Sequence, residues 1–224
     1  MTTQSSYLDQ KGLTVKDLVT IGIFTALFFV FELIGSLPFA PNPALTFYQP
    51  FGIALLCGPV FLLMVAKVPK RGTIAILGII NGIVWFALGM HWGMDLGYII
   101  MGIAAEIVAG MKGYKNIKWN IAAYLLFCLG PAGVFVAYFF DPTAWAQTML
   151  EKGTAQEYID TMTAAAPTGM LPAILLGTVV IAVISGLVGK KLLKKQFERA
   201  GVTETRTWAR SEADCECPLA GITA

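Results

Sequence analysis

Two acidic side chains lie inside long apolar runs of this sequence. Glu32 is near the end of the run over residues 16–35, and Glu106 is in the run over residues 96–111. A charge at membrane depth costs about 2.5 to 3.5 kcal/mol on insertion scales, so each acid should face other helices or water and have a partner there. Glu106 can hold a helix bundle together, through a basic residue or a bound proton, or it can relay protons. Glu32 can be structural or can contact a ligand.

The chain has one histidine, His91, which follows Met90 and precedes Trp92. An isolated histidine of this kind is either a polar loop residue or a ligand contact. Because histidine and methionine are both ligands of haem iron, a haem-like tetrapyrrole is one candidate ligand. A bare metal ion needs three or four converging ligands, which a single histidine does not supply. We therefore expect no bound metal and no cofactor.

Aromatic and polar residues accompany His91 and an upstream proline-rich segment. We expect a binding site under the segments at residues 38–49 and 91–95, where apolar side chains can bury a ligand and a few polar groups can orient it. Trp and Tyr residues also gather at membrane interfaces without any ligand, which is the alternative explanation. The residues expected to contact a ligand are Tyr48, Gln49, His91, Trp92, Asp95 and Tyr98.

The sequence shows no group of side chains suited to catalysis. An intramembrane enzyme needs paired acids, a serine with a lysine, or a histidine cluster at one depth, and the two acids described above are isolated. There is no GxxxxGK[ST] phosphate loop, so any ATP must be hydrolysed by another chain. Cys57 and Cys128 lie in apolar runs, and the C-x-C of Cys215 and Cys217 is too small for a zinc site alone. We therefore expect no enzymatic activity.

The elements that hold these residues are predicted to be membrane helices. Of the 224 residues, 56% are hydrophobic and 13% are charged, and the mean hydropathy is +0.69. This is more apolar sequence than a soluble core needs. The net charge of +2 gives no indication of nucleic-acid binding. The composition therefore predicts an all-α polytopic membrane protein embedded in a lipid bilayer.

The apolar runs predict six transmembrane helices, since about 20 apolar residues span a bilayer. Gly130-Pro131 interrupts the fifth of these runs. The long connection over residues 141–168 predicts short amphipathic helices on a membrane surface. The predicted spans are residues 16–35, 44–66, 73–90, 96–111, 119–140 and 169–188, within a membrane domain over residues 1–201 that is followed by a polar tail over residues 202–224.

Lysine and arginine residues occur in alternate connections. They lie in the leader, in the turns at residues 67–71 and 112–118, and in the run at residues 190–199, whereas the other loops carry almost none. Basic residues gather on the cytoplasmic side of membrane proteins. The pattern predicts a six-helix bundle with both termini in the cytoplasm, and it places the proline-rich loop and the turn at His91 outside.

The first predicted span contains Gly22 and Ala26, which lie one helical turn apart. Such a pair of small residues lets the backbone of another helix approach closely. That other helix can belong to the same bundle or to a different protein.

The sequence resembles the Trep_Strep group of membrane proteins over residues 10–201. The resemblance rests on KDLVTIGIFTALFF near the start, the basic turn AKVPKRG, the segments GPAGVFVAYFF and EYIDTMTAAAPTGMLP, and the closing GLVGKKLLKKQFERAG. Trep_Strep proteins are classed as substrate-binding S components of energy-coupling factor (ECF) transporters. The resemblance implies six helices in a bacterial plasma membrane and the binding of a vitamin, metal or related micronutrient from outside. It implies as partners a transmembrane coupling subunit and two ABC ATPases.

The resemblance also implies a role for the small residues of the first span. Members of that transporter class commonly carry an AxxxA docking motif in the first helix, and Gly22 and Ala26 occupy the matching place. These two residues are therefore expected to dock the coupling subunit.

Two other classes of function are open from the residues alone, an intramembrane lipid-handling enzyme and an accessory membrane protein without a substrate. The enzyme lacks a catalytic group, as described above. The accessory protein does not need the ordered outer loops implied by Pro38, Pro41, Pro43 and Pro50. The sequence favours the micronutrient-binding subunit of an ABC importer, and it does not indicate which substrate is carried.

Overall fold

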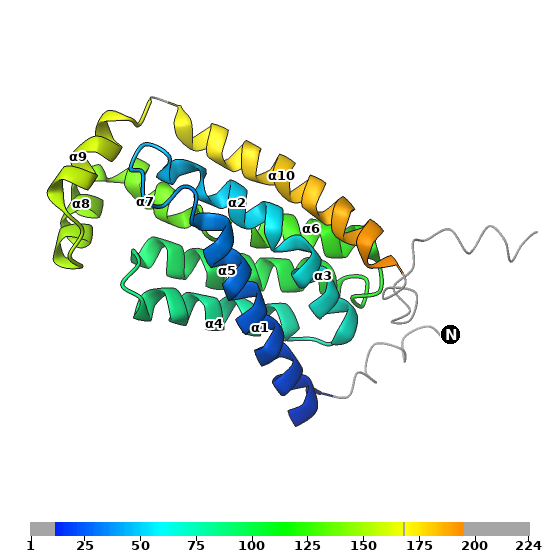
Figure 1. Ribbon diagram of the computed structural model, residues 1–224. Helices are drawn as coiled ribbons and strands as arrows, with labels where there is room; N and C mark the ends of the chain where they lie inside the picture. The colour runs from blue at the N-terminus through cyan, green and yellow to red at the C-terminus, as the bar shows by residue number, and fades with distance from the viewer. Residues whose placement is uncertain (1–11, 168, 195–224) are drawn as a thin grey trace, which may run out of the picture.

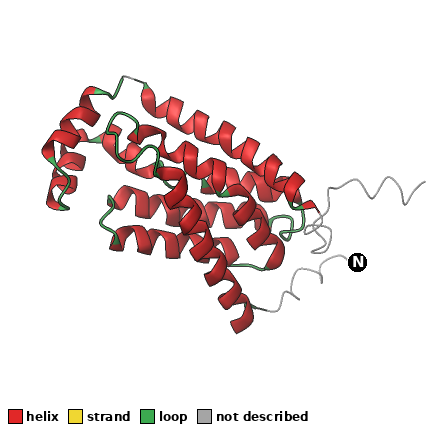
Figure 2. Ribbon diagram, viewed as in Figure 1, coloured by secondary structure: helices red, strands yellow, loops and turns green. Residues whose placement is uncertain are grey.

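The regular elements of the structure are helices. The computed structural model describes residues 12–167 and 169–194, and these ranges contain no strand. Figure 1 shows most helices running in roughly the same direction with α1 lying across them, and Figure 2 shows loops mainly at the two ends of the bundle. The expected all-α fold is confirmed. The elements are α1 (Val15–Ser36), η1 (Thr46–Tyr48, a 3₁₀ helix), α2 (Gln49–Leu56), α3 (Gly58–Lys67), α4 (Thr73–Ala87), α5 (Trp92–Gly110), α6 (Ile117–Phe127), α7 (Gly133–Phe140), α8 (Pro142–Glu151), α9 (Gln156–Ala164) and α10 (Met170–Leu192).

Helix α1 matches the first predicted span and begins with a capping box. The Thr14 hydroxyl accepts a hydrogen bond from the Asp17 backbone N–H at 3.3 Å, and the Asp17 carboxylate accepts one from the Thr14 N–H at 2.8 Å. These bonds satisfy two amides that a helix start otherwise leaves unpaired. The same carboxylate pairs with Lys70 at 2.6 Å. This ion pair ties the start of α1 to the basic turn between α3 and α4.

The second predicted span is a bent pair of helices, in which α3 follows α2 at an angle of 43°. Pro59 has no backbone N–H, so the Leu55 carbonyl lacks its usual helical donor. The Ser185 hydroxyl donates to that carbonyl at 2.6 Å, and the Tyr124 hydroxyl donates to the neighbouring Ala54 carbonyl at 2.7 Å. Side chains of α10 and α6 therefore satisfy the carbonyl groups that the bend frees.

Helices α4 and α5 pack with their backbones in direct contact. A methyl group added at Gly82 would lie 2.9 Å from the Asp95 carbonyl oxygen, and one added at Gly78 would lie 2.6 Å from the Tyr98 carbonyl oxygen. Both distances are shorter than a carbon–oxygen contact allows, so only glycine fits at the two positions. The contact sets Asp95 and Tyr98 of α5 beside the turn of α4 between Gly78 and Gly82.

The start of α5 corrects one sequence expectation. The helix begins at Trp92, so the predicted fourth span starts too late and residues 91–95 do not form an outer turn. His91 is the N-cap, and its Nδ1 accepts a hydrogen bond from the Gly93 N–H at 3.0 Å. Sequence patterns miss this start because histidine is not among the residues that usually cap helices.

The fifth predicted run and the long connection after it fold as expected. Residues 128–132, which include Gly130-Pro131, separate α6 from α7, and the connection contains the two short helices α8 and α9. Trp145 of α8 and Ile159 and Met162 of α9 are buried. We call residues 142–164 the α8–α9 hairpin; it lies at one end of the bundle (Figure 1).

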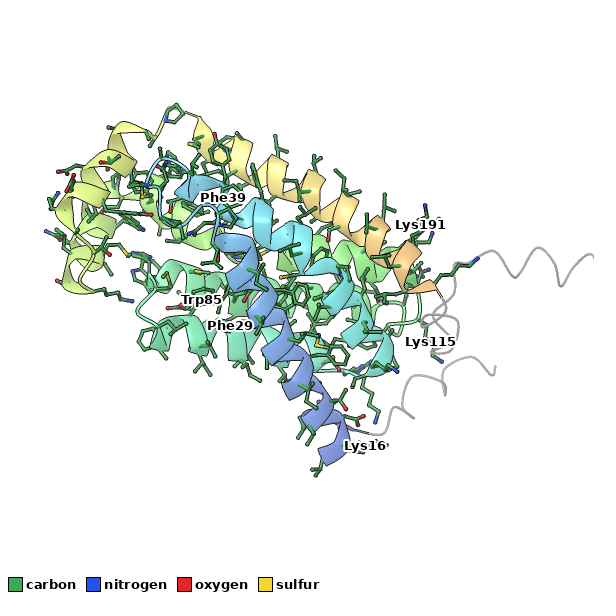
Figure 3. All side chains as sticks on the ribbon, in the orientation of Figure 1. Lys16, Phe29, Phe39, Trp85, Lys115 and Lys191 are labelled. Atoms are coloured by element: carbon green, nitrogen blue, oxygen red, sulfur yellow. The ribbon has the colours of Figure 1, made fainter. Side chains whose placement is uncertain are left out.

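The number of membrane spans is confirmed only in part. Among the described residues, α1, α5 and α10 are long and apolar enough to cross a membrane, and the bent pair α2–α3 adds a fourth. Helices α4 and α6 are apolar but shorter. Six spans and cytoplasmic termini therefore stay predictions. Figure 3 shows Lys16, Lys115 and Lys191 toward one end of the bundle, which we call the basic end, and the α8–α9 hairpin lies at the opposite end.

The cysteines divide between described and undescribed residues. Cys57 and Cys128 are buried among apolar side chains. Cys215, Cys217 and the rest of the predicted tail at residues 202–224 lie outside the described residues, and so does the leader at residues 1–11.

Candidate ligand-binding site

Glu106 is a helix cap. Its Oε1 accepts a hydrogen bond from the Gly72 N–H at 2.7 Å, and its Oε2 accepts bonds from the N–H groups of Ile74 at 2.8 Å and Ala75 at 3.2 Å. The Tyr114 hydroxyl also donates to this carboxylate, and burial together with that bond raises the pKa of Tyr114. A negative charge is favourable at a helix N-terminus. The hydrogen-bond partners of Glu106 are therefore the start of α4 and Tyr114, and none of them is a basic side chain.

Replacing Glu106 by alanine should lower the free energy of unfolding by about 1.5 to 3 kcal/mol, the usual scale for hydrogen bonds to a charged group. The loss arises because the first amides of α4 and the Tyr114 hydroxyl lose their acceptor. Thermal unfolding in detergent measures the change. Replacing the exposed Glu151 by alanine is the matched control and should have little effect. Equal stability of both variants would mean that Glu106 does not hold α4.

Glu32 lies at a junction of three helices. Its side chain in α1 is 0% exposed, and both carboxylate oxygens have a donor. The hydroxyl of Tyr98, in α5, donates to Oε1, and Nε1 of Trp85, in α4, donates to Oε2 at 3.4 Å. Trp85 in turn packs on Phe29 with 5.2 Å between ring centroids, and Figure 3 shows these two side chains together. Glu32 therefore joins α1 to α4 and α5.

Asp95 and Asn81 lie on the same pair of helices and have no hydrogen-bond partner. Asp95 is 6% exposed and Asn81 is 0% exposed, yet none of their four side-chain nitrogen and oxygen atoms is bonded. Asp95 precedes Tyr98 by three residues, so the two lie on the same face of α5. Asn81 precedes Trp85 by four residues, so these two lie on the same face of α4. We call Glu32, Asn81, Trp85, Asp95 and Tyr98 the buried polar cluster.

His91 lies one helical turn beyond Asp95, toward the α8–α9 hairpin. It is 2% exposed, which contradicts the interpretation of a solvated loop residue. Its ring centroid is 5.0 Å from that of Trp92 and 6.2 Å from that of Trp145. Burial, and secondarily the charge of Lys152, lowers the pKa of His91 to about 4. The imidazole is thus neutral at pH 7, and its Nδ1 can accept the capping bond.

The α8–α9 hairpin is fastened to the end of the bundle by polar contacts. Lys152 Nζ donates to the Met90 carbonyl and lies 5.5 Å from the centroid of the Phe86 ring. On the other side, the Tyr158 hydroxyl bonds with the Thr46 hydroxyl at 2.6 Å. The hairpin therefore covers both the α4–α5 connection and the η1 segment.

The predicted site residues fall into separate places. Tyr48 borders a groove of about 390 Å³ between α2 and α10, whose other lining residues are Phe51, Pro167, Gly169, Met170, Ala173, Ile174 and Gly177. Gln49 is half-buried at the start of α2, and Trp92 is 52% exposed. Asp95 and Tyr98 belong to the buried polar cluster, with His91 beside it. The structure thus brings His91, Asp95 and Tyr98 together and leaves Tyr48 in an apolar groove.

Sequence reasoning missed Asn81, Trp85 and Lys152. Asn81 gave a usable signal, because an amide within the apolar run over residues 73–90 needs a polar partner. Lys152 gave no such signal in the sequence, since a lysine in a polar connection is ordinarily a solvated residue. Among the described residues, no three His, Cys, Asp or Glu side chains converge as metal ligands do.

The small residues of α1 are not used within this bundle. Gly22 and Ala26 are exposed, and a methyl group added at Gly22 would meet no atom within 4 Å. Large apolar side chains flank them, including Val19, Ile23 and Val30. Packing within the bundle therefore does not explain the pair.

One family matches this chain in a comparison of sequences. Its description is "Hypothetical bacterial integral membrane protein (Trep_Strep)", and the match covers residues 15–199. No curated protein and no solved structure matches the chain. The matched range contains all the helices described above.

Proposed function

Because the chain belongs to the Trep_Strep family of bacterial integral membrane proteins, we propose that it is the substrate-binding subunit of an ECF-type ABC importer. It is a multi-pass protein of the bacterial cell membrane. In this role it binds a micronutrient from outside the cell and has no catalytic activity of its own. Separate ATPases and a coupling subunit supply the energy.

The observation that carries this proposal is the buried polar cluster. Asn81 and Asp95 hold polar groups without partners inside an apolar bundle, although native proteins pair nearly all such groups. Ionisable residues within membrane helices commonly mark substrate pathways. Asp95 lies one helical turn from His91, whose ring is 6.2 Å from that of Trp145 in the α8–α9 hairpin, and the charge pattern predicts that this hairpin lies outside the cell. A substrate arriving from outside would meet this end first.

Two further features support a subunit that depends on partners. The sequence has no phosphate-binding loop, so it cannot energise import alone. Gly22 and Ala26 leave an open strip on α1, where the backbone of a partner helix can come close. We assign this strip to the coupling subunit.

Substrate uptake should require the ATPases and the coupling subunit. The test is uptake of the molecule that copurifies with the protein, measured in proteoliposomes that contain either the isolated chain or the assembled complex with ATP inside. We expect uptake by the assembled complex and none by the isolated chain. Undiminished uptake without the partners would refute the proposal, and so would the lack of ATP-dependent uptake by the complex.

A further inference from the structure

We propose that the buried polar cluster binds a ligand through a protonated nitrogen, a compact ammonium or amidinium group that pairs with Asp95 and Asn81. The inference rests on the proposed function, because it names the chemical class of the substrate. It also makes a statement about the site that can be tested without transport.

Unsatisfied polar atoms are concentrated at Asn81 and Asp95. Six buried side-chain polar atoms have no partner in the described part of the chain, and four of them belong to Asn81 and Asp95. The two residues lie on helices whose backbones touch at Gly82, where an added methyl group would be 2.9 Å from the Asp95 carbonyl oxygen. Both residues therefore lie at this helix contact, where one ligand group would bind them together.

The unpaired groups of these two residues are mainly hydrogen-bond acceptors. Asp95 offers two oxygen acceptors, and Asn81 offers one oxygen and one amide nitrogen. Glu32 already accepts a hydrogen bond on each oxygen, from Tyr98 and Trp85, so Asp95 is the carboxyl group of the cluster that is left without a donor. Acceptors outnumber donors, so the complementary ligand group must donate hydrogen bonds.

The buried polar cluster contains two acidic residues and no basic one. A buried carboxylate that keeps its charge needs a cationic partner, and no side chain of the cluster supplies one. The charge of Lys152 reaches Asp95 electrostatically, but its Nζ is bonded to the Met90 carbonyl. A positively charged ligand nitrogen would supply this partner. An anionic group at the same place would face Asp95 with like charge.

Close packing of α4 and α5 limits the size of the charged group. The contact between α4 and α5 leaves little room, so the charged group must be compact. Beyond Asp95, toward the hairpin, the indole of Trp145 is 4% exposed and its Nε1 has no partner. An apolar or aromatic portion of the ligand with one acceptor atom suits that surface.

Thermal unfolding of the purified full-length protein in detergent tests the inference. The probes are methylammonium and guanidinium chloride, with sodium chloride at equal ionic strength and acetamide as a neutral donor. The variants are Asp95→Asn, which keeps the shape of the side chain, Asn81→Ala, and Glu151→Gln as a control that removes an exposed carboxylate at the same end.

At least one cationic probe should raise the unfolding midpoint of the wild type and of Glu151→Gln more than sodium chloride or acetamide does. Asp95→Asn should weaken its apparent affinity by about tenfold or more, since a buried charge pair is lost, and Asn81→Ala should weaken it to a smaller extent. The inference is wrong if neither cation stabilises the wild type beyond the two controls, or if the effect persists in Asp95→Asn.

Failure of this inference and failure of the proposed function can be told apart. If a cation binds in a way that depends on Asp95 but the assembled complex shows no ATP-dependent uptake, the inferred binding site is supported and the proposed transport function is refuted. If the complex takes up a substrate without a basic nitrogen, and this ATP-dependent uptake is unchanged in Asp95→Asn, the proposed transport function is supported and the inferred cation site is refuted.

Discussion

A Glu32→Leu protein should unfold at a markedly lower temperature than the wild type in the same detergent. Leucine removes the acceptor of both the Tyr98 hydroxyl and the Trp85 indole N–H, and both donors stay buried. Each orphaned donor costs about 1 to 3 kcal/mol, so the summed loss is about 2 to 6 kcal/mol. The Trp85 bond is long at 3.4 Å and should contribute the smaller part. Thermal unfolding followed by size-exclusion chromatography measures the loss.

Two comparisons separate the lost hydrogen bonds from a general effect of mutating α1. Leu33→Ala changes the adjacent residue, which is exposed, and should alter stability little. A Glu32→Leu, Tyr98→Phe double variant removes donor and acceptor together, so it should be more stable than the sum of the single losses predicts. Strict additivity of the two substitutions would show that the bond to Tyr98 contributes nothing.

Replacing Ala26 by leucine should abolish copurification with the coupling subunit while leaving the fold intact. Ala26 is exposed, so the larger side chain disturbs nothing within the described bundle. On the open strip of α1 it would hold a partner helix away from the backbone at Gly22, and close approach is what makes such pairs favourable. Copurification of a tagged coupling subunit, with unfolding temperature as the check on folding, provides the measurement.

The matched control for this substitution is Ala87→Leu, which adds the same side chain at an exposed position of α4. It should leave assembly unchanged. If Ala26→Leu copurifies with wild-type amounts of the coupling subunit, the docking prediction is wrong and the open strip of α1 faces lipid instead. Loss of complex with both variants would point to a general effect of added leucine rather than to a docking site.

The sequence predicted the local structure well, because local structure depends on neighbouring residues. Apolar runs of spanning length predicted α1 and α10, whose observed bounds differ from the expected ones by a few residues. Gly130-Pro131 predicted the break between α6 and α7, since proline removes a helical donor whatever surrounds it. The amphipathic pattern of the connection over residues 141–168 predicted α8 and α9, because such a pattern depends only on residues within the same segment.

The contacts of the candidate site depended on tertiary structure. Nothing near Glu106 in sequence indicates that it caps α4, because its partners are backbone amides more than 30 residues away. Likewise, the burial of His91 follows from the α8–α9 hairpin folding over it, which its own apolar and aromatic neighbours do not reveal.

The sequence by itself therefore determined that this is an all-helical bacterial membrane protein and which residues carry polar groups into its apolar runs. Only the tertiary structure decided that Asn81 and Asp95 are buried beside the contact between α4 and α5, that Tyr98 and Trp85 bond Glu32, and that Tyr48 stands apart from them. The physical reason is that hydrophobic length and proline act within a few residues, whereas the pairing of helix faces depends on close packing between segments far apart in the chain. In this chain glycines at the α4–α5 contact set that pairing, because they let the two backbones touch.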